Sequence, residues 1–132
     1  MVNEFVLRNI YNNIEELSDP DLQYKVWIKA EIPDHISSYT ELRCSLFDSN
    51  DYEGFITRDV KEFDLKEEFI HKLIELNVVL KGYEDKGKTE LEIINDPVWR
   101  DISKVAKEVK TLWEKSTLYD RMAKLDDNNL LS

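Results

Sequence analysis

The run Asp48-Ser-Asn-Asp-Tyr-Glu-Gly54 has the residue types that come nearest to a metal site in this chain. Oxygen ligands at alternate positions followed by a glycine are typical of a calcium-binding EF-hand loop. Counted from Asp48, the glycine falls at the seventh position instead of the sixth, and Asp59 stands where a bidentate glutamate is needed. Counted from Ser49, the glycine fits but the twelfth residue is Val60. We therefore interpret the run as a helix C-terminus and a solvated turn whose glycine takes a positive φ.

Side chains that could act as nucleophile or base are few. The histidines are His35, in a predicted loop, and His71, one position off an apolar helix face. We interpret both as solvent-side or boundary residues and not as catalytic bases. Cys44, the single cysteine, has no recognisable activating signature around it and is predicted to be a small buried hydrophobe. The spacing of these three residues does not predict a zinc site, so no catalytic, metal or cofactor residue is assigned.

Charge is more informative than any motif. Eighteen Lys and Arg stand against 28 Asp and Glu, for a formal net charge of −10. Proteins that bind nucleic acids or anionic membranes need surface cations, so this balance argues against both partners. The whole excess lies in residues 1–95, whereas residues 96–132 hold acids and bases in equal number. Such a distribution favours an acidic face that meets a basic protein, because charge complementarity speeds association and selects partners.

The composition predicts one globular domain over residues 1–132. With 42% hydrophobic residues the chain is too apolar to be disordered, and its length allows a real core. The first residues, Met1–Ile10, lack the pattern of a signal peptide, and no stretch is apolar enough for a membrane helix. With one cysteine no intrachain disulfide is possible, so a cytoplasmic location is expected. Residues 116–132 are expected to form a loosely attached C-terminal tail.

Several helix starts are marked in the sequence. Asp19-Pro20 and Asp96-Pro97 each place a capping carboxylate before a proline at the first helical position. The Ser38–Glu41 and Asp64–Glu67 pairs have the spacing of a capping box. Apolar residues also recur at helical spacing in three stripes. These are Leu7, Ile10, Tyr11, Ile14 and Leu17; then Phe69, Leu73, Leu76, Leu80 and Tyr83, widened by Ile70 and Ile74; and Trp99, Ile102, Val105, Ala106, Val109, Leu112 and Trp113.

In other segments apolar and polar residues alternate, as is typical of strands. Tyr24–Ile32 alternates strictly, and Thr89–Ile94 and Leu42–Leu46 also fit a period of two. Together they would form a small five-stranded, OB-like β-barrel with one helix. The proline at position 20 and the scarcity of glycine favour the other interpretation. We therefore predict a mostly α, single-domain bundle or array of about five helices, with the OB-like barrel as the alternative.

The order and spacing of several stretches of this sequence resemble those of a known group of proteins. They include the stretch from Glu15 to Trp27 (Glu-Glu-Leu-Ser-Asp-Pro-Asp-Leu-Gln-Tyr-Lys-Val-Trp) and Leu-Arg-Cys-Ser-Leu-Phe-Asp48 after Ser38. Ile-Ile-Asn-Asp-Pro-Val-Trp99 and a helix ending in Lys-Thr-Leu-Trp113 complete the pattern. Over about residues 4–115, this succession resembles the small acidic immunity proteins of bacterial contact-dependent growth inhibition and related polymorphic toxin systems. The tail from 118 to 132 has no place in that pattern.

The resemblance implies a helical, cytoplasmic, non-enzymatic protein that neutralises a cognate toxin domain. Such a toxin is commonly a basic nuclease, and carboxylates that cover its active or substrate-binding surface compete with the nucleic acid. We expect the partner contacts at the densest acid cluster outside the apolar stripes, with an aromatic residue as anchor. They are Asp48, Asp51, Tyr52 and Glu53.

Two other functions stay open at the level of the sequence, and the oligomeric state is not indicated. The alternating Tyr24–Ile32 run would suit a small OB-like nucleic-acid-binding module. The carboxylates of Asp48, Asp51 and Glu53 could hold a divalent metal in an enzyme of unknown class. The three tryptophans, by contrast, lie on apolar stripes and are predicted to be core residues and not contacts.

Overall fold

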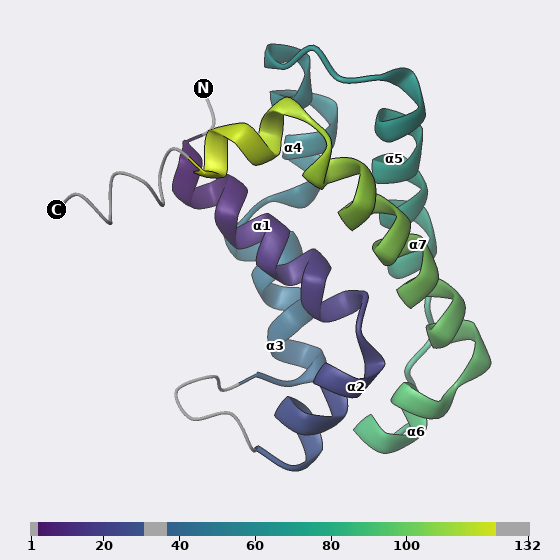
Figure 1. Cartoon of the computed structure of the whole chain (residues 1–132). Helices are drawn as coiled ribbons and strands as arrows, with labels where there is room; N and C mark the ends of the chain where they lie inside the picture. The colour runs from purple at the N-terminus through teal and green to yellow at the C-terminus, as the bar shows by residue number, and fades with distance from the viewer. Residues whose placement is uncertain (1–2, 31–36, 124–132) are drawn as a thin grey trace, which may run out of the picture.

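The computed structural model describes residues 3–30 and 37–123, and every regular element within them is a helix (Figure 1). The prediction of a mostly α fold is therefore confirmed, and the alternative of an OB-like barrel is wrong. The α-helices are α1 (Glu4–Leu17), α2 (Pro20–Gln23), α3 (Tyr39–Cys44), α4 (Tyr52–Thr57), α5 (Glu67–Lys81), α6 (Glu90–Asn95) and α7 (Pro97–Glu114). Two π-helical turns, η1 (Tyr24–Ile28) and η2 (Ser45–Ser49), extend α2 and α3, and η3 (Asp59–Glu62) is a 3₁₀ turn.

Helices α1, α5 and α7 form the framework of the bundle. Helix α7 packs against both of the others, and Figure 1 shows it running between α1 and α5 from the end near α6 to the end near α4. The three predicted stripes are the faces that meet in the core: their members are buried or half-buried, with the exception of Ile74, which is exposed. The short helices α2, α3, α4 and α6 cover the remaining sides of this framework.

Two clusters of aromatic rings fill the core, each centred on a tryptophan of α7. Around Trp113 lie Tyr11, Phe55 and Phe69, with ring centroids 5.7 to 6.2 Å away. Around Trp99 lie Trp27, Tyr39 and Tyr83, at 5.2 to 6.2 Å. All three tryptophans are buried, so their predicted place in the core is confirmed.

Three of the four predicted helix starts are confirmed. The side chains of Asp19, Ser38 and Asp96 each accept a hydrogen bond from a backbone N–H in the first turn of their helix, at 3.0 to 3.1 Å. The start at Asp64 is wrong, because α5 begins at Glu67 and its first turn has no side-chain cap. The apolar residues on either side of Asp64, at positions 63 and 65, pack against the core and hold this segment outside the helix.

Helices α2 and α3 end in the same way. Each passes into a π-helical turn, closed by a hydrogen bond from Lys29 N to Tyr24 O (3.1 Å) and from Asn50 N to the carbonyl of Ser45 (2.9 Å). The second residue after each turn is left-handed and is not glycine, with φ 50° at Ala30 and 47° at position 51. The described part of the alternating run 24–32 is therefore helical up to residue 28.

The other alternating segments are also helical. Thr89 and Glu92 form a complete capping box at the start of α6, in which each side chain accepts a hydrogen bond from the other residue's backbone N–H. Residues 42–46 belong to α3 and η2. The apolar residues of a short helix can alternate over four or five positions, so this pattern did not separate helix from strand.

The chain after α7 returns to the core. Residues 117–123 form a further helical segment, in which Leu118 and Met122 are buried. The indole nitrogen of Trp113 donates to the sulfur of Met122 at 3.1 Å. The predicted loose tail is therefore wrong for residues 116–123, and residues 124–132 lie outside the described part. No helix among the described residues is long and apolar enough to cross a bilayer.

Candidate functional site

The predicted acidic contacts differ in their local partners. Asp48 lies exposed in η2 and forms no ion pair with a described residue. Asp51 caps α4: its side chain accepts from the backbone N–H of Gly54 at 3.2 Å and lies 3.6 Å from Arg58. Glu53 points toward α5, where its carboxylate lies 2.7 Å from the ammonium group of Lys81. Neighbours in the sequence therefore have different partners: Arg58 for Asp51 and Lys81 for Glu53.

Tyr52 is not a surface anchor, which corrects the prediction made for it. Its side chain is fully buried, and its hydroxyl donates to the backbone carbonyl of Leu73 on α5 at 2.7 Å. The ring lies between those of Phe47 and Phe55. Burial raises the pKa of the hydroxyl far above its usual value. As the first residue of α4 it points inward, although its neighbours in the sequence are acidic.

The left-handed residue of the 48–54 run is Asp51 and not Gly54, which the sequence had suggested. Gly54 lies inside α4, with its N–H toward the carboxylate that caps the helix. A Cβ atom at position 54 would lie only 2.2 Å from Oδ2 of Asp51. Glycine is therefore needed here to make room for the cap, and not for backbone freedom.

Cys44 and His71, considered above as a possible nucleophile and base, lie on different helices. Cys44 is exposed on α3, so its predicted burial is wrong. His71 is exposed on α5, 3.6 Å from the carboxylate of Glu67, and His35 lies outside the described residues. Among the described residues, no group of three or more His, Cys, Asp or Glu side chains is placed to hold a metal ion.

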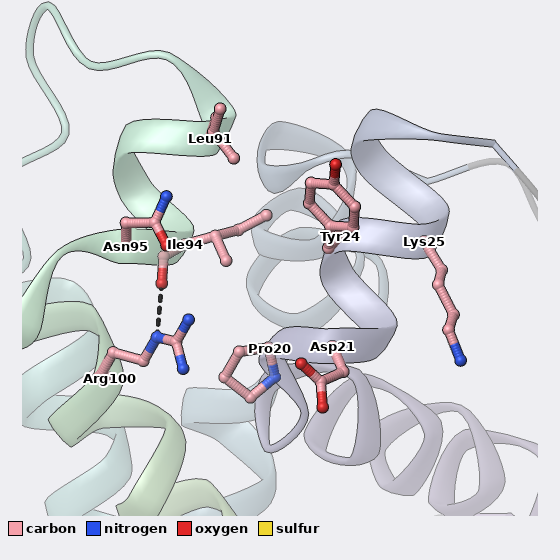
Figure 2. Close-up of a pocket in the computed structure, with 8 residues that line it drawn as sticks. All are labelled: Pro20, Asp21, Tyr24, Lys25, Leu91, Ile94, Asn95 and Arg100. Atoms are coloured by element: carbon pink, nitrogen blue, oxygen red, sulfur yellow. Dashed lines mark hydrogen bonds between the residues drawn. The ribbon is translucent and has the colours of Figure 1, made fainter.

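A groove of about 430 Å³ lies between α2–η1 and α6, at the end of the bundle where α7 begins (Figure 2). Figure 2 shows Tyr24 and Leu91 on opposite sides of it, with side chains 37% and 45% exposed. It also shows the guanidinium group of Arg100 pointing toward Pro20. The full lining consists of Pro20, Asp21, Tyr24, Lys25, Leu91, Ile94, Asn95 and Arg100.

The polar groups of the groove form few hydrogen bonds or ion pairs with other described residues. Nε of Arg100 donates to the backbone carbonyl of Ile94 at 2.7 Å, which fixes the guanidinium plane and leaves its remaining nitrogens toward the groove. Asp21 and Lys25 form no ion pair with a described residue. The groove therefore offers an aromatic ring, aliphatic side chains and charges of both signs to a ligand.

A buried hydrogen-bond network fixes the α2–η1 side of the groove and the start of α7. Gln23, in the same helix as Asp21, donates to the carbonyls of residues 16 and 17 at the end of α1, at 2.9 and 3.0 Å. Its side-chain oxygen accepts from the indole nitrogen of Trp99, the residue before Arg100, at 2.9 Å. The indole of Trp27 donates to the buried carboxylate of Glu16 at 3.1 Å. Such support orders a site before any ligand binds.

Next to the groove, the cap of α7 is strongly stabilised in its charged form. Lys88, Tyr83 and the backbone N–H of Val98 each donate to the carboxylate of Asp96, at 2.7 to 3.0 Å. These bonds, that of Lys88 above all, lower the pKa of Asp96 to about 2. The start of α7 therefore stays capped by a carboxylate throughout the neutral and mildly acidic range.

No pattern in the sequence predicted this groove. Its lining comes from α2–η1 and, about seventy residues later in the chain, from α6 and the start of α7; the sequence patterns around these residues predicted helix starts or strands and not a groove. The chain has no match among family models, curated proteins or solved structures. A functional assignment therefore rests on the chemistry of the site itself.

Proposed function

We propose that the protein is a non-enzymatic immunity protein that binds and neutralises a cognate toxin domain with a basic surface, such as a nuclease. The groove of Figure 2 carries this proposal, because Tyr24, Leu91 and Arg100 are exposed there beside the carboxylate of Asp21. Tyrosine and arginine are among the residues that contribute most to binding energy at protein interfaces. The resemblance of the sequence to small acidic immunity proteins points in the same direction.

The charge of the chain agrees with a basic partner. A nuclease presents cations where it grips phosphates, and a protein of net charge −10 is attracted to that surface. In this proposal, the exposed carboxylates of Asp48, Asp51 and Glu53 raise the association rate, although Asp51 and Glu53 also pair with Arg58 and Lys81. Tyr52 has no part in the contact because it is buried.

Inhibition would be steric in this mechanism. A side chain of the toxin enters the groove between Tyr24 and Leu91, and a toxin cation forms a charge-assisted hydrogen bond with Asp21. The body of the inhibitor then covers the surface that nucleic acid would occupy. Because the toxin acts inside the cell that must be protected, the proposal places the protein in the cytoplasm.

The decisive experiment is co-expression with the toxin domain encoded by the neighbouring upstream gene. We expect cell survival and copurification of the two proteins. If cells that make both proteins die as fast as cells that make the toxin domain alone, the proposal is wrong. A matched pair of variants then tests the groove: Asp21→Lys and Asp120→Lys reverse one exposed carboxylate each, and only Asp21 lines the groove.

We expect Asp21→Lys to weaken toxin binding at least tenfold, and Asp120→Lys to change it less than threefold. Tyr24→Ala should weaken binding by a similar factor to Asp21→Lys, since it removes the aromatic side of the groove. Isothermal titration calorimetry with the purified toxin domain measures all three. Wild-type affinity of both groove variants would place the interface elsewhere on the molecule.

A further inference from the structure

Helix α7 carries a stripe of apolar residues along one edge of the face that it buries in the core, where burial is incomplete. Val98, Val105 and Leu112 follow one another at intervals of seven residues, so they lie on one side of the helix. Val98 is 58% exposed, and the other two are half-buried. Arg100, which lines the groove of Figure 2, is two positions from Val98 and so points in nearly the opposite direction.

This stripe borders a shallow depression between α5 and α7. Val79 of α5 and Val98 and Val105 of α7 line a space of about 440 Å³. A second depression, of about 510 Å³, continues the seam along the same two helices to Leu112. The 18 residues of α7 span about 27 Å, enough for a second helix to lie along the seam.

The charges beside the stripe nearly balance, unlike those of the chain as a whole: four acidic residues and three lysines line the two depressions. Lys72 of α5 lies 3.2 Å from Glu75 and 2.6 Å from Glu108 of α7. Lys104 lies 3.7 Å from Asp101. A protein of net charge −10 repels its own copies, and this repulsion is weakest where acids and bases alternate.

We propose that the α5–α7 seam is a self-association surface, on which a second copy of this chain docks by its own seam to give a two-fold symmetric dimer. Two-fold symmetry places the same patch on both sides, so the patch must complement itself. Apolar residues at the centre meet their own equivalents, and alternating Lys and Glu side chains at the edge can meet charges of opposite sign. A basic partner would gain less at this balanced face than at the acidic remainder of the surface.

Sedimentation equilibrium of the purified full chain, from micromolar to millimolar concentration, tests the proposal. We expect a monomer–dimer equilibrium that Val98→Glu weakens at least tenfold. Val98 is the second residue of α7, where a carboxylate is favourable near the helix N-terminus, so the variant should fold normally. Phe5→Glu is the matched control, because Phe5 is 62% exposed and lies on α1, away from the seam. We expect the Phe5→Glu variant to dimerise as the wild type does.

Two results would overturn the proposal. The first is a monomer at every concentration. The second is a dimerisation constant that Val98→Glu and Phe5→Glu change by the same factor, or that neither substitution changes. Salt separates this surface from the proposed toxin site: added salt screens the repulsion between two acidic copies and should strengthen the dimer, whereas it should weaken binding to a basic toxin. Failure of the toxin-binding proposal would therefore leave the dimer proposal standing, and failure of the dimer proposal would leave the toxin-binding proposal standing.

Discussion

The side-chain oxygen of Gln23 accepts a hydrogen bond of 2.9 Å from the indole nitrogen of Trp99, across 76 positions of the chain. Gln23 is fully buried, and its amide nitrogen also donates to the carbonyls of Glu16 and Leu17. One side chain therefore joins the end of α1, the start of the α2–η1 segment and the first turn of α7. These are the elements that set the position of one side of the groove and of Arg100.

Replacing Gln23 by leucine should destabilise the fold by about 2–4 kcal/mol, because it leaves a buried indole N–H and two backbone carbonyls without these partners. Urea unfolding followed by tryptophan fluorescence measures the change. Asn95→Leu serves as the control at an exposed position, where we expect less than about 0.5 kcal/mol. A stability of Gln23→Leu equal to that of the wild type would contradict the role given to the network.

The contact between Asp51 and Gly54 predicts a substitution whose effect changes sign. Gly54→Ala should destabilise the protein by about 1–2 kcal/mol, because the new Cβ displaces the capping carboxylate. In an Asp51→Gly background only the flexible end of Arg58 lies near the new Cβ, at 3.1 Å, and it can move aside, so the same substitution should stabilise by about 0.5–1 kcal/mol through helix propensity. Denaturant unfolding of the four proteins forms a double-mutant cycle. Equal effects in both backgrounds would refute the steric explanation.

The carboxylate of Asp96 predicts a pH-dependent contribution to stability. Its pKa is about 2 in the folded protein, below the ordinary value of 3.8, so folding favours the charged form. The stabilisation is fully present above pH 4 and is lost as the pH falls through 2. Lys88→Met should raise the pKa of Asp96 toward its ordinary value, because Lys88 is the largest cause of the shift. Carboxyl chemical shifts in NMR titrations measure the pKa of Asp96 in the wild type and in Lys88→Met. An ordinary pKa of Asp96 in the wild type would contradict the hydrogen bonds described here.

The exposure of Cys44 predicts a fast reaction with a thiol reagent. Ellman's reagent should modify one thiol per native chain without denaturant, since Cys44 is the only cysteine and lies on the solvent side of α3. Cys44→Ser should change the free energy of unfolding by less than about 0.5 kcal/mol. Protection of the thiol until the protein unfolds would instead support the burial that its sequence context suggested.

Asp48 predicts a kinetic effect that rests on the proposed toxin-binding function. Asp48→Lys should slow association with the toxin at low salt and leave dissociation nearly unchanged, because an unpaired surface charge acts mainly at long range. Asp120→Lys makes the same change in net charge and separates the local effect from the global one. Stopped-flow measurements at two salt concentrations test this prediction, since high salt should remove the difference in association rate between the two variants. Identical association rates of the two variants would contradict a local role of Asp48.

Local signals in the sequence predicted much of the fold. The caps at Asp19, Ser38 and Asp96 were recognised because a cap depends on residues within one turn. The stripes of α1, α5 and α7 were recognised because a long helix with one buried face repeats its apolar residues. The capping box of Thr89 was missed, since its helix is only six residues long and its apolar residues also alternate.

The sequence by itself determined a helical, acidic chain with three long amphipathic helices and a core that contains Trp27, Trp99 and Trp113. Only the tertiary structure decided which surface residues stand together. It turned Tyr52 inward from an acidic run, exposed Cys44, and brought Tyr24 to the same groove as Arg100. Helical periodicity and capping are set by neighbours in the chain, whereas a groove is set by the packing of segments that are distant in the sequence.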